Sequence, residues 1–319
     1  VLAALLADGS LHGNVAILLG CSAMLVVLGV LDDKHSLSVP VRMMAQVFLV
    51  TVVIVDTGGT ITHLGALIGR DISMGMFAVP FSVVAFVGGI NSINMIDGMD
   101  GMAGKMALIS MLGVAVISYV AGNVDLLPLT WAMLGTLAGF LLLNSRVFVR
   151  RAWVFMGDSG SMWLRLVLVW FIVQLTQGNA PAEPAMVLWL LGIPLMDSVS
   201  VMFRRMRHKR SPFQADRTHI HYLLKHKGLS TRRNVLVLSL VQLVLVSIGV
   251  IFYLKNVPAW IVFWCFMLLW VFYTYLFHRN RGRDRRKDTA KLYPGRVDRR
   301  QNNRNFRAGD RKKLQRSST

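Results

Sequence analysis

The chain has 319 residues, of which 54% are hydrophobic and only 16% are charged, and its mean hydropathy is +0.53. Soluble domains are nearer 45–50% apolar and about 25% charged, so this composition excludes an ordinary soluble globule and favours a membrane protein. The net charge of +19 favours anionic partners. The two cysteines, Cys21 and Cys265, each lie in a hydrophobic run, which leaves a disulfide framework or a cysteine metal site unsupported.

Apolar runs long enough to cross about 30 Å of hydrocarbon predict transmembrane helices along most of the chain. The first run, at residues 1–7, is truncated because the chain opens at Val1 inside it, so we expect a fragment that lacks its N-terminal part. Nine further spans are predicted at about 14–31, 41–55, 76–96, 103–121, 128–144, 160–177, 184–203, 234–254 and 257–277. The predicted fold is all-α, a polytopic membrane helix bundle with about ten spans in this fragment.

Lysine and arginine indicate the orientation, because cytoplasmic loops are enriched in both. If the loop at 204–233 is cytoplasmic, 32 of the 35 basic residues fall on that side and only Arg70 and Lys255 on the other. Residues 1–277 then form one integral membrane domain, followed by a basic cytoplasmic tail at 278–319. The tail lacks apolar periodicity and is expected to be disordered. Anionic headgroups account for its charge, and its near lack of aromatic residues disfavours nucleic acid as a partner.

The most informative stretch closes the 76–96 span. Amide and carboxylate side chains recur there at every third residue, at Asn91, Asn94, Asp97 and Asp100. On a helix, neighbouring members of this set would lie close together on one side. Gly98 and Gly101 weaken the helix and allow the backbone to turn toward a ligand. Carboxylates at the mouth of an apolar helix are costly, which favours a functional site over a polar helix end that merely meets water.

The same orientation places further carboxylates at the cytoplasmic face. Asp32 and Asp33 close the second predicted span, and adjacent helical residues point about 100° apart. One of the two acids can therefore face the bundle as a base or phosphate-positioning group, while Lys34 or Arg42 holds the other. Asp197 is expected to be buried by its position in a span and to pair with a nearby cation.

A glycine-rich turn at 155–161 places Asp158 between two glycines. Ser159 or Ser161 is expected to cap the next helix, whose N-terminal amides would favour phosphate. Magnesium usually takes one or two protein oxygens and completes its shell with water and substrate phosphate, so Asp158 and Asn94 together suit it. The alternative is a structural turn with a helix cap.

The loop at 204–233 contains Arg217, His219 and His221. In an extended segment the two histidines share a face, whereas on a helix they diverge. Histidines accompanied by arginines and no thiolates suit a pyrophosphate or a nucleotide better than a structural zinc. Taken alone, the loop is equally consistent with a basic cytoplasmic connection that contains incidental histidines.

Five motifs in this order carry a resemblance to a known family: Leu-Asp-Asp at 31–33, Asn-Met-Ile-Asp-Gly-Met-Asp-Gly at 94–101, Phe-Met-Gly-Asp-Ser-Gly-Ser at 155–161, Ile-Pro-Leu-Met-Asp at 193–197, and Ser-Pro-Phe through Asp-Arg-Thr-His-Ile-His at 211–221. Over roughly residues 1–277 the chain resembles the polyprenyl-phosphate N-acetylhexosamine-1-phosphate transferase family, most of all its bacterial undecaprenyl-phosphate N-acetylglucosamine-1-phosphate branch. Members have eleven transmembrane helices and a cytoplasmic active site. Two positions depart from the pattern: Tyr222 replaces a second adjacent histidine, and Arg165 replaces a small residue within a span.

The resemblance implies a multi-pass enzyme of the bacterial cytoplasmic (inner) membrane with its C-terminus in the cytoplasm. It would transfer N-acetylglucosamine 1-phosphate from UDP-N-acetylglucosamine to undecaprenyl phosphate and release UMP. This is the first membrane step of lipid-linked polysaccharide synthesis, such as O-antigen, enterobacterial common antigen or a wall polymer. Mg²⁺ is the expected cofactor, with Mn²⁺ as the alternative metal.

The resemblance also suggests roles for the candidate residues. Asp158 and Asn94 would hold the metal, with Asp97 contributing through water. Asp32 or Asp33 would position or deprotonate the acceptor phosphate. The expected substrate contacts are Asp100 for the uridine, and Arg217, His219 and His221 for the sugar-pyrophosphate.

Three competing interpretations stay open at this point. A phospho-N-acetylmuramoyl-pentapeptide transferase-like enzyme would use the same acceptor and similar carboxylates. A transporter or channel would place acids and broken helices near the bilayer midplane, whereas these acids are predicted at one interface. The truncated start and Arg165 leave room for a non-catalytic membrane scaffold. The sequence does not indicate an oligomeric state.

Overall fold

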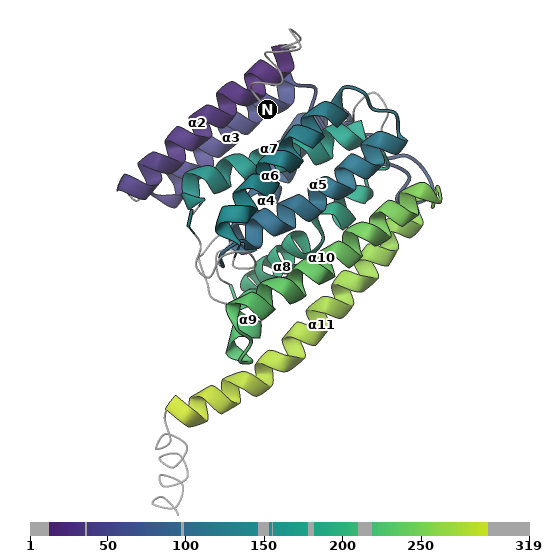
Figure 1. The fold of residues 1–319 in the computed structure, drawn as a ribbon. Coiled ribbons are helices and arrows are strands. Elements are labelled where there is room, and N and C mark those ends of the chain that lie inside the picture. Colours follow the sequence, from purple (N-terminus) through teal and green to yellow (C-terminus); the bar gives the residue numbers. More distant parts are fainter. Residues whose placement is uncertain are drawn as a thin grey trace, which may run out of the picture. The chain divides into compact units, whose positions relative to one another are not determined.

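The computed structural model of the chain describes residues 13–35, 37–96, 99–145, 153–154, 156–177, 182–209 and 219–292. Regular structure in these residues is helical, apart from an isolated β-bridge between His63 and Ser73. The helices are α2 (Gly13–His35), α3 (Val39–Asp56), η1 (Gly75–Phe77), α4 (Ala78–Ile96), α5 (Met102–Val120), α6 (Leu126–Asn144), α7 (Gly157–Gln177), α8 (Met186–Arg207), α9 (Ile220–His226), α10 (Thr231–Leu254) and α11 (Ala259–Leu292) (Figure 1). The predicted fold class, an all-α helix bundle, is confirmed.

Eight helices within the described residues are long and apolar enough to cross a membrane: α2, α4, α5, α6, α7, α8, α10 and α11. Their limits differ from the predicted ones by at most four residues, except at the end of α11. α3 forms a helix where the run at 41–55 predicts a span, but it is not among the eight. The apolar run at 1–7 lies outside the described residues, so the total of ten spans stays a prediction.

α7 is the most buried of the eight, with 78% of its candidate span enclosed by other parts of the protein. It packs against α2, α4, α5, α6 and α8. Glycines on two of these neighbours allow the close approach. A β-carbon at Gly29 of α2 would lie 2.7 Å from the backbone nitrogen of Ser159, and one at Gly89 of α4 would lie 2.8 Å from Val169. Real β-carbons do not approach this closely, so glycine is required for both contacts.

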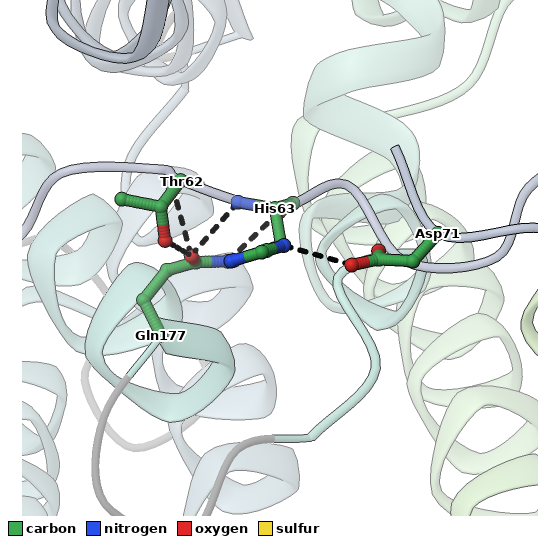
Figure 2. A network of polar contacts seen from close by, with 4 residues as sticks. All are labelled: Thr62, His63, Asp71 and Gln177. Carbon is green, nitrogen blue, oxygen red and sulfur yellow. Dashed lines mark hydrogen bonds and ion pairs between the residues drawn. The ribbon is translucent and has the colours of Figure 1, made fainter. Parts of the chain in front are cut away.

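The segment at 57–74, between α3 and η1, is fastened to the far end of α7 by Gln177 (Figure 2). The Oε1 atom of Gln177 accepts hydrogen bonds from the backbone nitrogen of Thr62 at 3.1 Å and from its hydroxyl at 3.2 Å. Its Nε2 atom donates to the carbonyl of His63 at 3.1 Å. His63 in turn lies 2.8 Å from Asp71, Nδ1 to Oδ2. One side chain thus fixes the connection to the helix end.

α8 is interrupted at Gly192, whose backbone angles of φ 38° and ψ −114° are not helical. Pro194 follows two residues later and has no N–H to donate to the carbonyl of Leu190, four residues before it. Gln242 of α10 lies against this break. Its Oε1 accepts a hydrogen bond from the backbone nitrogen of Ile193 at 2.9 Å, and its Nε2 donates to Leu190 at 2.9 Å. The two halves of α8 are therefore joined partly through α10.

α11 continues beyond its predicted end at residue 277 and runs to Leu292. The first fifteen residues of the tail, expected to be disordered, are therefore helical, and residues 293–319 lie outside the described part of the chain. Arginine and lysine are good helix formers, so a helix that leaves an apolar segment can continue through a basic one. The chain divides into two compact units, 1–267 and 268–319, and the site described next lies within the first.

Candidate functional site

The stretch from Asn91 to Gly101 spans the end of α4 and the turn into α5. α4 ends at Ile96, and Asp100 lies in the turn that follows, so the predicted single helical face is wrong for Asp100. Gly101 adopts φ 76°, the left-handed conformation that glycine tolerates best, which agrees with its predicted role in turning the backbone. Asn94 is exposed at the end of α4. Asp97 lies outside the described residues.

The side-chain amide of Asn91 makes contacts within the protein. Its Nδ2 atom donates to the carbonyl of Val87 at 2.8 Å, one turn earlier on α4. A longer contact of 3.5 Å reaches Oε1 of Gln46 on α3. Asn91 therefore joins two helices, whereas Asn94 has its side chain open to a ligand.

Of the two acids at the end of α2, Asp32 is the one that is bonded to a basic residue. Asp32 is buried, and its Oδ2 atom lies 2.7 Å from Nη1 of Arg42 in the first turn of α3. This is one of the two pairings that the sequence suggests. Because Asp32 is occupied by Arg42, Asp33 is left as the candidate for the ligand-facing role. The side chain of Asp33 lies outside the described residues.

The glycine-rich segment predicted as a turn at 155–161 includes the start of α7. α7 begins at Gly157, so Ser159 and Ser161 lie within the helix and the prediction that one of them caps it is wrong. Gly157 has φ 64°, a conformation that glycine adopts without strain, and this explains the start of the helix at that residue. Asp158 is thus in the first turn of α7. Its side chain lies outside the described residues.

Asp197 is the best-defined carboxylate of the site. It is 3% exposed on α8, in the half that follows the break. Its Oδ2 lies 2.8 Å from Nδ1 of His219, and its Oδ1 accepts a hydrogen bond from the backbone nitrogen of Ile220 at 3.1 Å. The predicted burial of Asp197 is confirmed, and its partner is the first histidine of the predicted loop motif, at the place where the sequence predicts a cation. Asp197 thereby fixes the start of α9.

The rings of His219 and His221 lie close together, although only His219 is in extended backbone and His221 lies in α9. His219 precedes α9 with extended backbone angles, and the two rings are nearly parallel, with 6.0 Å between centroids and 7° between planes. Tyr222, at the position where the resemblance leads us to expect histidine, packs on His221 with centroids 4.2 Å apart. Arg217 lies outside the described residues.

His221 is 1% exposed, and neither ring nitrogen has a hydrogen-bond partner among the residues that the structure describes. Burial lowers the pKa of His221 to about 4, so the ring is neutral near pH 7. Asn234 of α10 donates to the backbone carbonyl of His221 at 2.7 Å. A buried neutral imidazole with free nitrogens can accept a hydrogen bond from a bound ligand and donate one to it.

Contacts within the first unit bring these segments to one end of the bundle, here called the polar end. Gly29 of α2 packs on Ser159 of α7, one turn before Asp32 and one residue after Asp158. The hydroxyl of Ser198, next to Asp197, donates to the carbonyl of Ser92 on α4 at 3.1 Å. The motif-bearing ends of α2 and α7 are therefore in contact, as are those of α4 and α8, and Asp197 adds His219 of the fifth motif.

Comparison with known proteins gives the family. The sequence profile described as glycosyl transferase family 4 matches residues 15–176. The chain is 35% identical over 264 residues to the undecaprenyl-phosphate alpha-N-acetylglucosaminyl 1-phosphate transferase of Yersinia pestis, covering 82% of this chain and 72% of the relative. Proteins of the same name from Escherichia coli K12 (34% over 269 residues; 83% and 73%) and Haemophilus influenzae (33% over 256 residues; 79% and 72%) are also similar. The chain belongs to glycosyl transferase family 4.

The metal site predicted for this family 4 chain, Asp158 with Asn94, stays a prediction. Within the described residues no three His, Cys, Asp or Glu side chains come together as a metal site. The predicted pair needs only two, an amide oxygen from exposed Asn94 at the end of α4 and a carboxylate from Asp158 in the first turn of α7. Oxygen donors in that small number are the set that Mg²⁺ accepts when phosphate and water complete its shell.

Arg165 is the second position, after Tyr222, at which this chain departs from the pattern of the family. It is 2% exposed within α7 and is bonded to Ser161, one turn earlier, with Nε donating to the carbonyl at 2.6 Å and Nη2 donating to the hydroxyl. The guanidinium is therefore directed toward the first turn of α7, where Asp158 lies. This placement accommodates a cation in a span without exposing it to lipid.

Two residues of the site region were not among the predicted site residues. Asp197 has a sequence signal, an ionisable residue within a span, although its partner could not be read from the sequence. Gln242 has the same kind of signal, an amide inside the apolar run at 235–254, but it is not among the predicted site residues. Polar side chains inside apolar spans are costly unless they are bonded, so each such residue marks a specific contact.

Proposed function

We propose that this chain transfers N-acetylglucosamine 1-phosphate from UDP-N-acetylglucosamine to undecaprenyl phosphate at the cytoplasmic face of the inner membrane. The observation that carries the proposal is the similarity to transferases of that name, which covers about four fifths of this chain. The contacts of α2 with α7 and of α4 with α8 beside the motif segments support the proposal.

The reaction joins a lipid and a soluble nucleotide sugar. An oxygen of the lipid phosphate attacks the phosphorus that carries the sugar, and the bond from that phosphorus to the oxygen bridging it to the uridine phosphate breaks. UMP leaves with that oxygen, and the product is a lipid-linked diphosphate sugar. The acceptor tail stays in the bilayer, so its phosphate must meet the donor where apolar helices end, as they do at the polar end.

The residues divide between the two substrates. Asp32 is bonded to Arg42, so we assign the positioning of the acceptor phosphate to Asp33. A phosphate monoester is largely ionised near pH 7, and strong general-base catalysis is therefore not required. We assign the uridine to Asp100 and the sugar-pyrophosphate to Arg217, His219 and His221. Asp197 orients His219 through Nδ1, which leaves Nε2 for the donor.

Asp158 and Asn94 are the residues that would hold Mg²⁺, with Asp97 close by in the sequence. When bound there, Mg²⁺ would offset negative charge on the pyrophosphate. Both substrates are anionic, so cations are needed in the site, and Arg217 is the candidate that the chain itself supplies.

The proposal is tested by incubating the purified protein in detergent with radiolabelled UDP-N-acetylglucosamine, undecaprenyl phosphate and Mg²⁺. We expect label in the lipid fraction, and we expect Asp158→Asn to abolish it while the protein keeps its yield and melting temperature. Asp56→Asn, an exposed acid at the opposite end of α3, is the matched control and should be fully active. Near-normal turnover in Asp158→Asn would refute the metal assignment, and no labelled lipid from the unmodified chain would refute the activity.

The same assay separates the competing functions. A pentapeptide-type enzyme would use UDP-N-acetylmuramoyl-pentapeptide in place of UDP-N-acetylglucosamine. A transporter would produce no labelled lipid with either donor. α8 does contain a break of the kind that transporters use, but the backbone groups at this break are bonded to Gln242 and Ser110. That arrangement favours a structural role for the break over an ion site.

A further inference from the structure

Gln242 is completely buried in α10, a helix of 24 residues that is otherwise almost entirely apolar between Val235 and Leu254. An amide in such surroundings is unfavourable unless its donor and acceptor atoms are both bonded. Both are bonded here, and the main contacts go to the backbone of one other helix, α8. Gln242 therefore has a specific structural partner, the break at Gly192.

The contacts match the groups that the break leaves without partners. Pro194 cannot donate to the carbonyl of Leu190, and that carbonyl accepts hydrogen bonds from Nε2 of Gln242 at 2.9 Å and from the hydroxyl of Ser110 at 2.7 Å. The backbone nitrogen of Ile193, released by the turn at Gly192, donates to Oε1 of Gln242 at 2.9 Å. One amide thus bonds α8 on both sides of its interruption.

Glycine is required at the break for two reasons. Gly192 has φ 38°, which side chains rarely adopt, and a β-carbon there would lie 2.6 Å from Oε1 of Gln242. The irregular backbone and the amide of Gln242 therefore fit each other. Neither would be retained in this form without the other.

The half of α8 beyond the break carries Asp197, four residues after Ile193, and Asp197 holds His219 and the start of α9. The direction of this half-helix therefore sets where His219 lies. We propose that Gln242 is a positioning residue of the transferase site, acting through the α8 break and Asp197 on the histidine that meets the sugar nucleotide. This inference rests on the function proposed above.

The proposal predicts different effects on the two substrates, because the acceptor is held by contacts that do not involve Gln242. The acceptor phosphate is assigned to the end of α2, which is held by Arg42 of α3 and by α7, and neither contact passes through α8. Loss of Gln242 should therefore disturb the donor and spare the acceptor. General loosening of the fold would instead reduce the number of active molecules and affect both substrates alike.

The test compares Gln242→Leu, which removes both hydrogen bonds, with Gln242→Glu, whose protonated carboxyl can accept and donate like the amide. Ser239→Ala is the matched control, because this α10 hydroxyl has no hydrogen-bond partner among the described residues. We expect Gln242→Leu to raise the KM for UDP-N-acetylglucosamine at least fivefold and to leave the KM for undecaprenyl phosphate within twofold. Gln242→Glu and Ser239→Ala should stay within twofold for both. Unchanged KM values in Gln242→Leu, with or without a lower kcat, would overturn the proposal.

A second measurement does not need activity and so separates this inference from the proposed function. Spin labels at Phe203 of α8 and Leu236 of α10, both on exposed positions, report the distance between the two helices once Cys21 and Cys265 are replaced by serine. We expect the distance distribution to shift or broaden in Gln242→Leu and to stay unchanged in Ser239→Ala. An unchanged distribution in Gln242→Leu would overturn the inference. If the leucine variant does not fold, Gln242→Asn, which is too short to bond both sides, takes its place.

Discussion

Two histidine–aspartate pairs of the protein have the same local geometry. At the polar end Nδ1 of His219 lies 2.8 Å from Oδ2 of Asp197, and in the segment at 57–74 Nδ1 of His63 lies 2.8 Å from Oδ2 of Asp71 (Figure 2). The first pair has side chains that are 4% exposed, and the second has side chains that are 55% and 54% exposed. Identical distances therefore occur in opposite surroundings.

Burial decides how much each pair matters. Exposed ion pairs contribute about 0.2–1 kcal/mol, because water and salt screen the charges. Removing one partner of a buried pair costs about 3–5 kcal/mol, because the other partner is left without compensation. Asp197 also binds the backbone of Ile220, so its loss would release the start of α9 as well. The same substitution in each pair should give very different results.

The largest expected effect is that of Asp197→Asn. Asparagine keeps the shape of aspartate but removes the charge, and hydrogen bonds to charged groups are worth about 1.5–3 kcal/mol. We expect transfer to fall at least about tenfold, the equivalent of 1.4 kcal/mol in the barrier, and the melting temperature in detergent to fall by several degrees. Activity within twofold of the unmodified chain would show that the buried pair does not position His219.

Acid pH is expected to lower the stability of the folded chain by an intermediate amount, through His221. Burial lowers its pKa from 6.5 to about 4, so between these values the unfolded chain binds a proton that the folded chain does not. Stability is therefore complete above pH 6.5 and falls as the pH decreases toward 4. His221→Leu should lose less of its melting temperature between pH 7 and pH 5 than the unmodified chain. His226→Leu, at an exposed position of α9, is the control and should retain the original acid sensitivity. Equal acid sensitivity in all three proteins would contradict the assignment.

The smallest effect is expected for Asp71→Asn. The segment at 57–74 is still fastened by Gln177, whose contacts with Thr62 and His63 do not involve Asp71. Transfer should stay within about 1.5-fold and the melting temperature within about 1 °C, as for other exposed pairs. A loss as large as that of Asp197→Asn would mean that exposure is a poor guide to the importance of a pair in this protein.

Hydropathy predicts most of the fold, because length and apolar composition are properties of each span by itself. α5 and α6 begin and end within two residues of the predicted limits. The errors occur where a polar segment continues a helix or interrupts one. α11 runs on through basic residues, and the regular spacing from Asn91 to Asp100 crosses a helix end at Ile96 that spacing alone does not reveal.

The candidate site is predictable as a set of residues but not as a set of contacts. Hydropathy and charge single out Asp32 and Asp197, since acids near or within apolar spans stand out. Arg42 is one of the two partners that the sequence offers for the acidic pair, but which acid it binds depends on how α2 and α3 pack. His219, 22 residues from Asp197, is a partner that the sequence does not indicate. In the sequence, Pro194 indicates the break in α8. Its bonding to Gln242 is a tertiary contact that no local pattern contains.

The contact between Gly29 and Ser159 has a consequence for the order of assembly. These residues are 130 positions apart, and at about 5–20 residues per second the ribosome needs roughly 7–26 seconds to make the chain between them. α2 and α3 are neighbours in sequence and can pair early, whereas the glycine face of α2 has to wait for α7 to be synthesised. During that interval lipid, or another membrane protein, borders the surface on which half of the catalytic site will later be built.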